Sequence, residues 1–254
     1  MACVGRGFTA VTKLRILVVQ HQANAGLGVY QEQLRKAASE LVIAGPVFET
    51  AVPSSAAGFD AVIVLGGSMG PTDDEKAPWL VQTRELLRDA VAGGVPTLGI
   101  CLGAQLLATA LNGEVKTMPQ GPEIGVCRVR VSDDAGADPL FGNCAGAALP
   151  AVQWHYLEVA KLPDGAVVLG GSEHCPHQIY RVGDAAWGTQ FHPEANAQTV
   201  VDWVKEDPAE LDRLKLNPEE LVSAAQREEP ALADESQQLM ERFLGFAAAR
   251  RVAS

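Results

Sequence analysis

The chain has 254 residues, of which 47% are hydrophobic, so it can bury a sizeable core as one large α/β domain or as one domain with an appendage. Its formal net charge of −11 and the lack of any basic run argue against a nucleic-acid-binding surface, because phosphate contacts need clustered Lys and Arg. No stretch suits a signal-peptide core or a membrane span, and five scattered cysteines fit reduced thiols, so we predict a cytoplasmic protein.

The first part of the chain predicts alternating strands and helices. We expect residues 1–12 to be disordered. Short apolar runs predict strands, and helical spacing predicts helices, in the order strand 14–19, helix 30–40, strand 41–48, strand 61–65, helix 79–92 and strand 95–100. Near-continuous apolar strands alternating with helices indicate a mostly parallel central sheet with helices on both faces. In such sheets, sites form at the carboxyl ends of the strands.

The rest of the chain changes character twice. Between residues 114 and 184, short β-like runs separated by turns predict a small antiparallel portion. Beyond Ala197 the chain looks helical, with Pro208 and Pro218 at expected helix starts and many acidic residues. We therefore expect residues 13–204 to form one domain, and residues 205–254 to be an acidic helical extension packed on it.

A cysteine flanked by glycines follows the predicted strand 95–100. In Gly99-Ile-Cys101-Leu-Gly103 the G-x-C-x-G spacing is the cysteine form of a nucleophile elbow. Such a sharp strand-to-helix turn crowds the backbone, which the glycines relieve, and the start of the following helix favours a thiolate. A small buried cysteine with packing glycines is the alternative interpretation.

A candidate acid–base pair lies far along the chain, in Gln190-Phe-His192-Pro-Glu194. Pro193 disfavours helical backbone at His192, and residues two apart on an extended segment project to the same side. His192 and Glu194 are therefore able to meet, or at least to share a pocket wall. A base oriented by a carboxylate is what a cysteine nucleophile requires, although a histidine beside a proline is more often structural.

The loop Gly66-Gly-Ser-Met-Gly70 directly follows the third predicted strand. Its backbone N–H groups could hold an oxyanion, as a tetrahedral intermediate demands. A phosphate cradle is a weaker alternative, because the loop lacks the Gly-Lys-Ser/Thr ending, and a plain turn is the simplest one.

Together these three motifs resemble those of class I glutamine amidotransferases of the triad type. The likeness covers about residues 14–204 and is nearest to stand-alone proteins similar to the amidotransferase domain of GMP synthetase. The resemblance implies a flavodoxin-like fold, with Cys101 as nucleophile, His192 as general acid and base, and Glu194 orienting the histidine.

The resemblance also implies roles for the residues around the triad. The backbone N–H groups of Gly67 and Leu102 would form the oxyanion hole. The remaining expected substrate contacts are Gly66, Ser68, Gln105, Trp154, His155 and Tyr156.

The implied reaction is attack of Cys101 on the glutamine side-chain amide, release of ammonia, and hydrolysis of a γ-glutamyl thioester to glutamate. No cofactor and no metal are expected. The ammonia acceptor stays open, and a separate synthetase subunit is one possible partner. A stand-alone γ-glutamyl peptide or amide hydrolase and a non-catalytic regulatory or binding subunit are the alternatives.

Three further features of the sequence are weak evidence for other functions. His174-Cys175-Pro-His177 lacks a second ligand pair for a metal, and Gly26-Leu-Gly28 lacks the third glycine of a dinucleotide loop. An α/β-hydrolase with a cysteine elbow is a rival class, but there the acid precedes the histidine by a long stretch.

Overall fold

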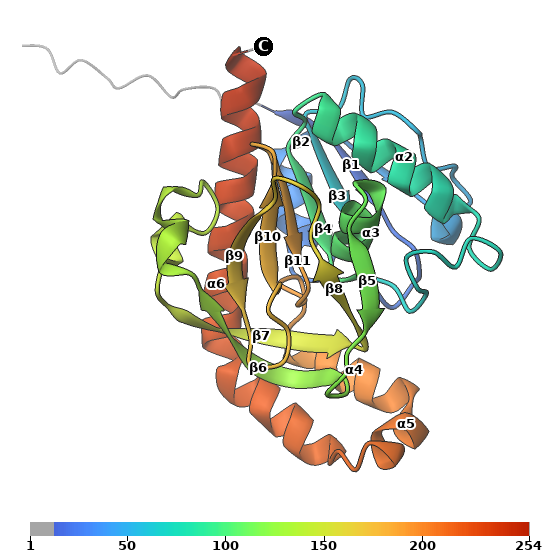
Figure 1. Ribbon diagram of the computed structural model, residues 1–254, viewed down its shortest axis with the longest axis vertical. Helices are drawn as coiled ribbons and strands as arrows, with labels where there is room; N and C mark the ends of the chain where they lie inside the picture. The colour runs from blue at the N-terminus through green and yellow to red at the C-terminus, as the bar shows by residue number, and fades with distance from the viewer. Residues whose placement is uncertain (1–12, 254) are drawn as a thin grey trace, which may run out of the picture.

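The computed structural model describes residues 13–253, so the expectation for residues 1–12 lies outside the described residues. Within this range nine strands form one sheet in the order β2-β1-β3-β4-β11-β10-β9-β6-β7, and β5 pairs with β8 in a separate ribbon (Figure 1). The strands are β1 (Leu14–Val19), β2 (Ala38–Ala44), β3 (Ala61–Val64), β4 (Thr97–Ile100), β5 (Glu114–Thr117), β6 (Glu123–Val131), β7 (Ala148–His155), β8 (Leu157–Lys161), β9 (Val167–Gly171), β10 (Ile179–Val182) and β11 (Ala186–Thr189).

The half of the sheet from β2 to β11 is parallel throughout. Its central strands are fully buried runs of apolar residues, as a sheet covered on both faces requires. β4 pairs with β11 so that Ile100 lies opposite Thr189, and the N–H of Cys101 donates to the carbonyl of Thr189 at 2.8 Å. The two chain segments that leave these strands, after Ile100 and after Thr189, therefore start side by side.

The other half, from β11 through β10, β9 and β6 to β7, is antiparallel. β6 and β7 pair over most of their length and cross below the parallel strands in Figure 1. This pairing brings His155, at the end of β7, opposite Glu123 at the start of β6. The predicted mostly parallel sheet with an antiparallel portion is confirmed.

Helices cover both faces of the sheet, as predicted. On one face lie α1 (Tyr30–Ala37) and the second half of α6 (Pro218–Ala253), and on the other α2 (Trp79–Ala92) and α3 (Leu102–Ala110). Alternate residues of β1 divide between the two cores: Ile16 and Val18 face the first, and Leu17 and Val19 the second. The α2 bounds match the prediction, and a proline precedes this helix.

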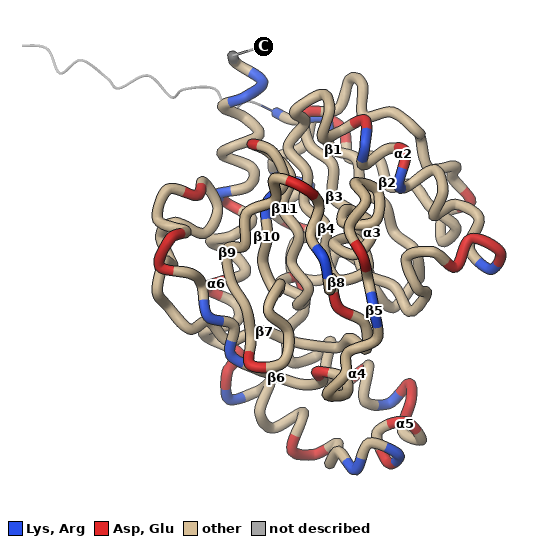
Figure 2. Tube along the Cα trace, viewed as in Figure 1, with Lys and Arg blue, Asp and Glu red and all other residues tan. Residues whose placement is uncertain are grey.

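The C-terminal helices form a third, smaller core with β7. α4 (Ala197–Glu206), α5 (Pro208–Arg213) and the first half of α6 pack around Trp203 and Val152. A capping box of Asn196 and Thr199 starts α4, and prolines start α5 and α6. Charged residues of both signs gather on α5, whereas the central strands carry few (Figure 2). The division at residue 204 stays a prediction.

Across residues 13–253, no helix has the length and apolar character needed to cross a bilayer.

Candidate active site

Cys101 occupies the turn between β4 and α3. Its φ angle is +51°, a value that a non-glycine residue rarely adopts. A Cβ on Gly99 would lie 2.6 Å from backbone atoms of Gly103, and a Cβ on Gly103 would lie 2.0 Å from the carbonyl oxygen of Val64. Both glycines are thus required by close backbone packing, and the predicted elbow geometry is present.

His192 and Glu194 meet, as the sequence predicts, but not on an extended segment. The Nδ1 atom of His192 lies 2.7 Å from Oε1 of Glu194, and both side chains are buried. The N–H of Ala195 donates to the carbonyl of His192 at 3.2 Å, so the backbone makes a turn through Pro193 and Glu194. The prediction of an extended segment was wrong, because this turn rather than alternation brings the two side chains together.

Three neighbouring elements hold this turn in place. The His192 N–H donates to the Val152 carbonyl of β7 at 2.8 Å, and the Val29 N–H donates to the Glu194 carbonyl at 3.0 Å. The hydroxyl of Ser236, on α6, donates to the Pro193 carbonyl. The sequence offered no local signal for these long-range contacts.

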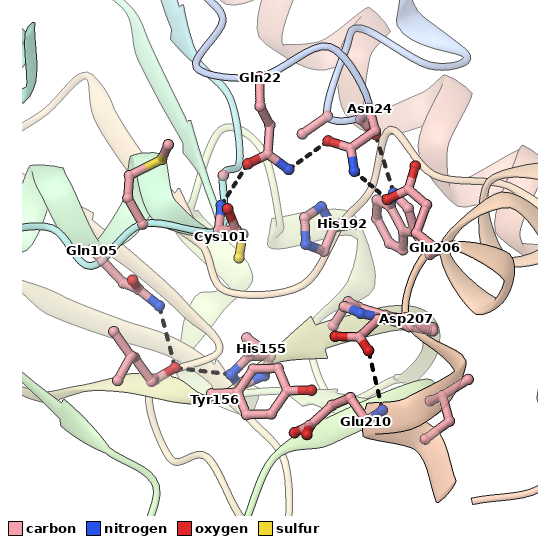
Figure 3. A pocket seen from close by; sticks show the side chains of 18 residues that line it. Gln22, Asn24, Cys101, Gln105, His155, Tyr156, His192, Glu206, Asp207 and Glu210 are labelled. Carbon is pink, nitrogen blue, oxygen red and sulfur yellow. Dashed lines mark hydrogen bonds between the residues drawn. The ribbon is translucent and has the colours of Figure 1, made fainter. Parts of the chain in front are cut away.

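The histidine ring lies beside the cysteine (Figure 3). A Cβ on Gly66 would lie 2.9 Å from Cε1 of His192 and 3.7 Å from Cβ of Cys101, so the glycine loop borders both. Burial by itself lowers the pKa of His192, but the charge of Glu194 and the hydrogen-bonded Cys101 outweigh burial and raise it. The histidine is thereby favoured in its charged form next to the sulfur.

Two backbone N–H groups adjoin the cysteine. A Cβ on Gly67 would lie 2.8 Å from Cδ2 of Leu102, which places the glycine loop against the start of α3. Within the described residues, neither the Gly67 nor the Leu102 N–H donates to another protein group. Both donors are thus available to a ligand.

Cys101 opens into a pocket of about 290 Å³. Eight of the eleven predicted site residues line this pocket: Gly67, Ser68, Cys101, Gln105, Trp154, His155, Tyr156 and His192. Gly66, Leu102 and Glu194 do not line the pocket; they lie behind the residues that do, Glu194 against His192 and Leu102 against Gly67. The three sequence motifs and the segment 154–156 therefore converge on one cavity.

The sequence prediction missed one wall of the pocket, which α4 and α5 supply. This wall consists of Trp203, Glu206, Asp207, Glu210 and Leu211. Trp203 packs edge-on against His192, with ring centroids 4.8 Å apart. Glu206, Asp207 and Glu210, the first acidic residues of the predicted extension 205–254, thus face the site (Figure 3). Neither periodicity nor composition distinguishes an acidic face turned to solvent from one turned to a pocket.

A chain of hydrogen bonds crosses the mouth of the pocket. The Ser68 N–H donates to Oε1 of Gln22 at 2.8 Å, Gln22 donates to Asn24 at 2.5 Å, and Asn24 donates to Glu206. The chain connects the glycine-rich loop with the end of α4 (Figure 3). The sequence prediction also missed Gln22 and Asn24. Both follow the carboxyl end of β1, and sites in parallel sheets form at the carboxyl ends of the strands.

A buried polar cluster lies behind the segment 154–156. The two ring nitrogens of His155 face acceptors, the Leu157 carbonyl at 2.9 Å and the Glu123 carboxylate at 3.1 Å. Ser172 and Gln178 donate to the same carboxylate, each at 2.6 Å. Burial on its own raises the pKa of Glu123, but the hydrogen bonds from His155 and Ser172 outweigh burial and lower it. This cluster braces the pocket wall.

The three other described cysteines are poorly suited to nucleophilic attack. Burial raises the pKa of the Cys175 thiol to about 12 and that of Cys127 to about 11, and it also raises that of Cys144. A raised thiol pKa makes a cysteine a poor nucleophile near neutral pH.

Two weak motifs have structural explanations. His174 contacts Gln120, and His177 bonds the Val159 carbonyl at 2.7 Å, so their rings face different partners. No group of three or more His, Cys, Asp or Glu side chains in residues 13–253 is placed to hold a metal ion. Gly28 has φ +49°, and a Cβ there would lie 2.0 Å from the Glu194 carbonyl oxygen. That glycine lets the first loop approach the histidine turn.

Comparisons with known proteins agree with this geometry. A family model described as glutamine amidotransferase class-I matches residues 27–202. The glutamine amidotransferase-like protein YfeJ of Salmonella typhimurium is 30% identical over 201 residues, covering 78% of this chain and 83% of its own. The crystal structure of a glutamine amidotransferase from Thermotoga maritima superposes with a TM-score of 0.75 at 30% identity, covering 91% of this chain and 98% of its own.

Relatives that match over shorter segments are enzymes of other kinds. Gamma-glutamyl peptidase 3 of Arabidopsis thaliana is 26% identical over 148 residues, covering 58% of this chain and 59% of its own. A glutamine-hydrolysing GMP synthase of Symbiobacterium thermophilum is 39% identical over 106 residues, covering 40% of this chain. The match spans only 19% of that much longer synthase.

Proposed function

The chain belongs to the class I glutamine amidotransferase family, and from this premise we propose that it hydrolyses the side-chain amide of glutamine, or a related γ-glutamyl amide, through Cys101. The observation that carries the proposal is the placement of a cysteine with strained backbone beside His192, whose Nδ1 atom bonds the buried carboxylate of Glu194. Cys101 is the nucleophile, His192 the general acid and base, and Glu194 the group that orients the ring.

The first half-reaction forms a thioester. The Cys101 thiolate attacks the amide carbon, and the tetrahedral intermediate collapses by breaking its C–N bond. The His192 imidazolium gives its proton to the departing nitrogen, which leaves as ammonia or an amine. The raised pKa of His192 supports this role, because the ring then carries the proton when the thiolate attacks.

The second half-reaction consumes water. Neutral His192 takes a proton from a water molecule that attacks the thioester carbon, and the C–S bond breaks with its electron pair returning to sulfur. Glutamate leaves, and the charged histidine and the thiolate are restored. In both halves the N–H groups of Gly67 and Leu102 hold the oxyanion, a role supported by their freedom from other protein partners.

The walls of the pocket support binding of the glutamyl part. Gln105, Ser68 and the segment 154–156 provide polar groups and aromatic surface around Cys101. Glu206 and Asp207 supply negative charge at the mouth, where the α-ammonium group of the substrate would lie.

A second candidate substrate class is a γ-glutamyl peptide or other γ-glutamyl amide. Gamma-glutamyl peptidases of Arabidopsis thaliana are among the relatives. The cavity of about 290 Å³ also continues from Cys101 to α5, which leaves room for a leaving group larger than ammonia. If glutamine is the substrate instead, we propose that a separate synthetase subunit receives the ammonia.

The test is glutamate release by the purified protein from glutamine, γ-glutamyl methylamide and γ-glutamyl dipeptides, with ammonia measured in parallel. A preference for glutamine favours an ammonia donor, and a preference for the dipeptides favours a stand-alone hydrolase. Release from none of them would overturn hydrolysis by the isolated chain and favour a non-catalytic subunit.

A further inference from the structure

Gln190 lies against the sulfur of Cys101 although it does not line the pocket. It follows β11 directly, its side chain is 1% exposed, and its Nε2 atom lies 3.7 Å from Sγ of Cys101. The pairing of β4 with β11 produces this contact, since both segments leave the sheet at the same edge. The glutamine therefore reaches the reacting sulfur from the protein interior, behind the pocket-lining Gln105 to which it is bonded.

The orientation of the Gln190 carboxamide is determined by its neighbours. The Leu157 carbonyl can only accept, and Nε2 of Gln105 donates to it at 3.2 Å. The same nitrogen donates to Oε1 of Gln190 at 3.2 Å, so the oxygen of Gln190 faces Gln105 and its nitrogen faces the sulfur. His155 donates to the same Leu157 carbonyl and so fixes the end of this hydrogen-bond series that lies away from Gln190. A flipped Gln190 carboxamide would bring its nitrogen against the Nε2 donor of Gln105 and its oxygen onto the sulfur.

We propose that Gln190 is a further catalytic residue, whose carboxamide N–H donates to the Cys101 sulfur and stabilises it as a thiolate. This inference rests on the proposed role of Cys101 as nucleophile. A hydrogen bond to a charged acceptor is stronger than one to a neutral acceptor, so the contact favours the thiolate over the thiol. It acts again when the thioester C–S bond breaks and the electron pair returns to sulfur.

Gln190 differs from His192, the titrating group that hydrogen-bonds the sulfur, because a carboxamide does not titrate. The other groups nearby are Glu194, which contacts His192, the Cys175 thiol in the segment between β9 and β10, and the start of α3 at Leu102. His192 must lose its proton during the reaction, and its support for the thiolate disappears in that step. The Gln190 N–H remains in place throughout.

The experiment is the rate of alkylation of Cys101 by iodoacetamide as a function of pH, followed by peptide mass spectrometry on the full chain. Gln190→Leu keeps the side chain's size and removes the donor. We expect alkylation near neutral pH to slow about tenfold and to recover at high pH, where the thiol ionises without help. Gln190→Glu places a carboxylate against the sulfur, and we expect it to slow alkylation further.

Gln153→Leu is the matched control, because Gln153 is a fully buried glutamine of β7 whose carboxamide bonds no described protein group. Its alkylation profile should match the unchanged protein. If Gln190→Leu does not fold, Gln190→Glu also removes the amide donor and keeps a polar side chain of equal length. Profiles of the Gln190 variants that coincide with the unchanged protein would overturn the inference. An unreactive Cys101 in the unchanged protein would instead count against the proposed function.

Discussion

Exchanging His21 for glutamine should flatten the pH dependence of stability on the acid side of neutrality. The imidazole lies at the carboxyl end of β1, is 3% exposed, and accepts a hydrogen bond on Nδ1 from the indole N–H of Trp79 at 3.1 Å. Burial lowers the pKa of His21 from 6.5 to about 4. Below pH 6.5, His21 therefore becomes protonated in the unfolded chain but stays neutral in the folded protein. The free energy of unfolding then falls steadily with pH until about pH 4, where His21 is protonated in the folded protein too.

The magnitude follows from the size of the shift. A difference of about 2.5 pH units, at 1.36 kcal/mol for each, is about 3 kcal/mol of unfolding free energy lost as the pH falls through this window. His21→Gln removes the titration and keeps an acceptor for Trp79. Urea unfolding of both proteins between pH 4 and pH 8 measures the effect, because other titrating groups cancel in the difference. A constant difference across the whole range would refute the reasoning.

Three further outcomes are expected. Near pH 7, iodoacetamide should label Cys101 well before Cys175, whose thiol pKa burial raises to about 12, and peptide mapping that finds Cys175 labelled first would contradict the site assignment. Gly103→Ala should lower the unfolding free energy by about 3 kcal/mol or more, because its Cβ would overlap a backbone carbonyl of β3; denaturation showing no loss would refute this packing. Gly66→Ala should cut kcat/KM about a hundredfold while the protein stays folded, because the added methyl displaces the His192 ring, and unaltered kinetics would argue against that contact.

The central strands β3 and β4 were predictable because they are fully buried and lie in short, largely apolar runs, whereas the half-exposed edge strand β2 begins at Ala38, three residues before the predicted strand 41–48. Helix α2 was predicted with the correct bounds, since a proline precedes it and glycines follow it. The elbow around Cys101 was equally readable, because the constraint on its two glycines is local and depends on a turn between adjacent elements.

The rest of the site depends on contacts between distant segments. Trp203 and Glu206 reach the pocket only because α4 folds back over the histidine turn, and no local pattern encodes that direction. Gln190 was visible in the sequence as part of a motif, but its contact with Cys101 arises from the pairing of β11 with β4. The histidine–carboxylate contact was predicted for the wrong reason, because a turn replaces the expected extended backbone at Pro193.

The central claim is that Cys101 carries out amide hydrolysis, and the most direct test is glutamate release by the purified protein beside its Cys101→Ala and Cys175→Ala variants. We expect the first variant to lose turnover on the preferred γ-glutamyl substrate and the second, which removes a buried thiol outside the pocket lining, to keep it. Turnover that persists in a folded Cys101→Ala protein would show that Cys101 is not the nucleophile.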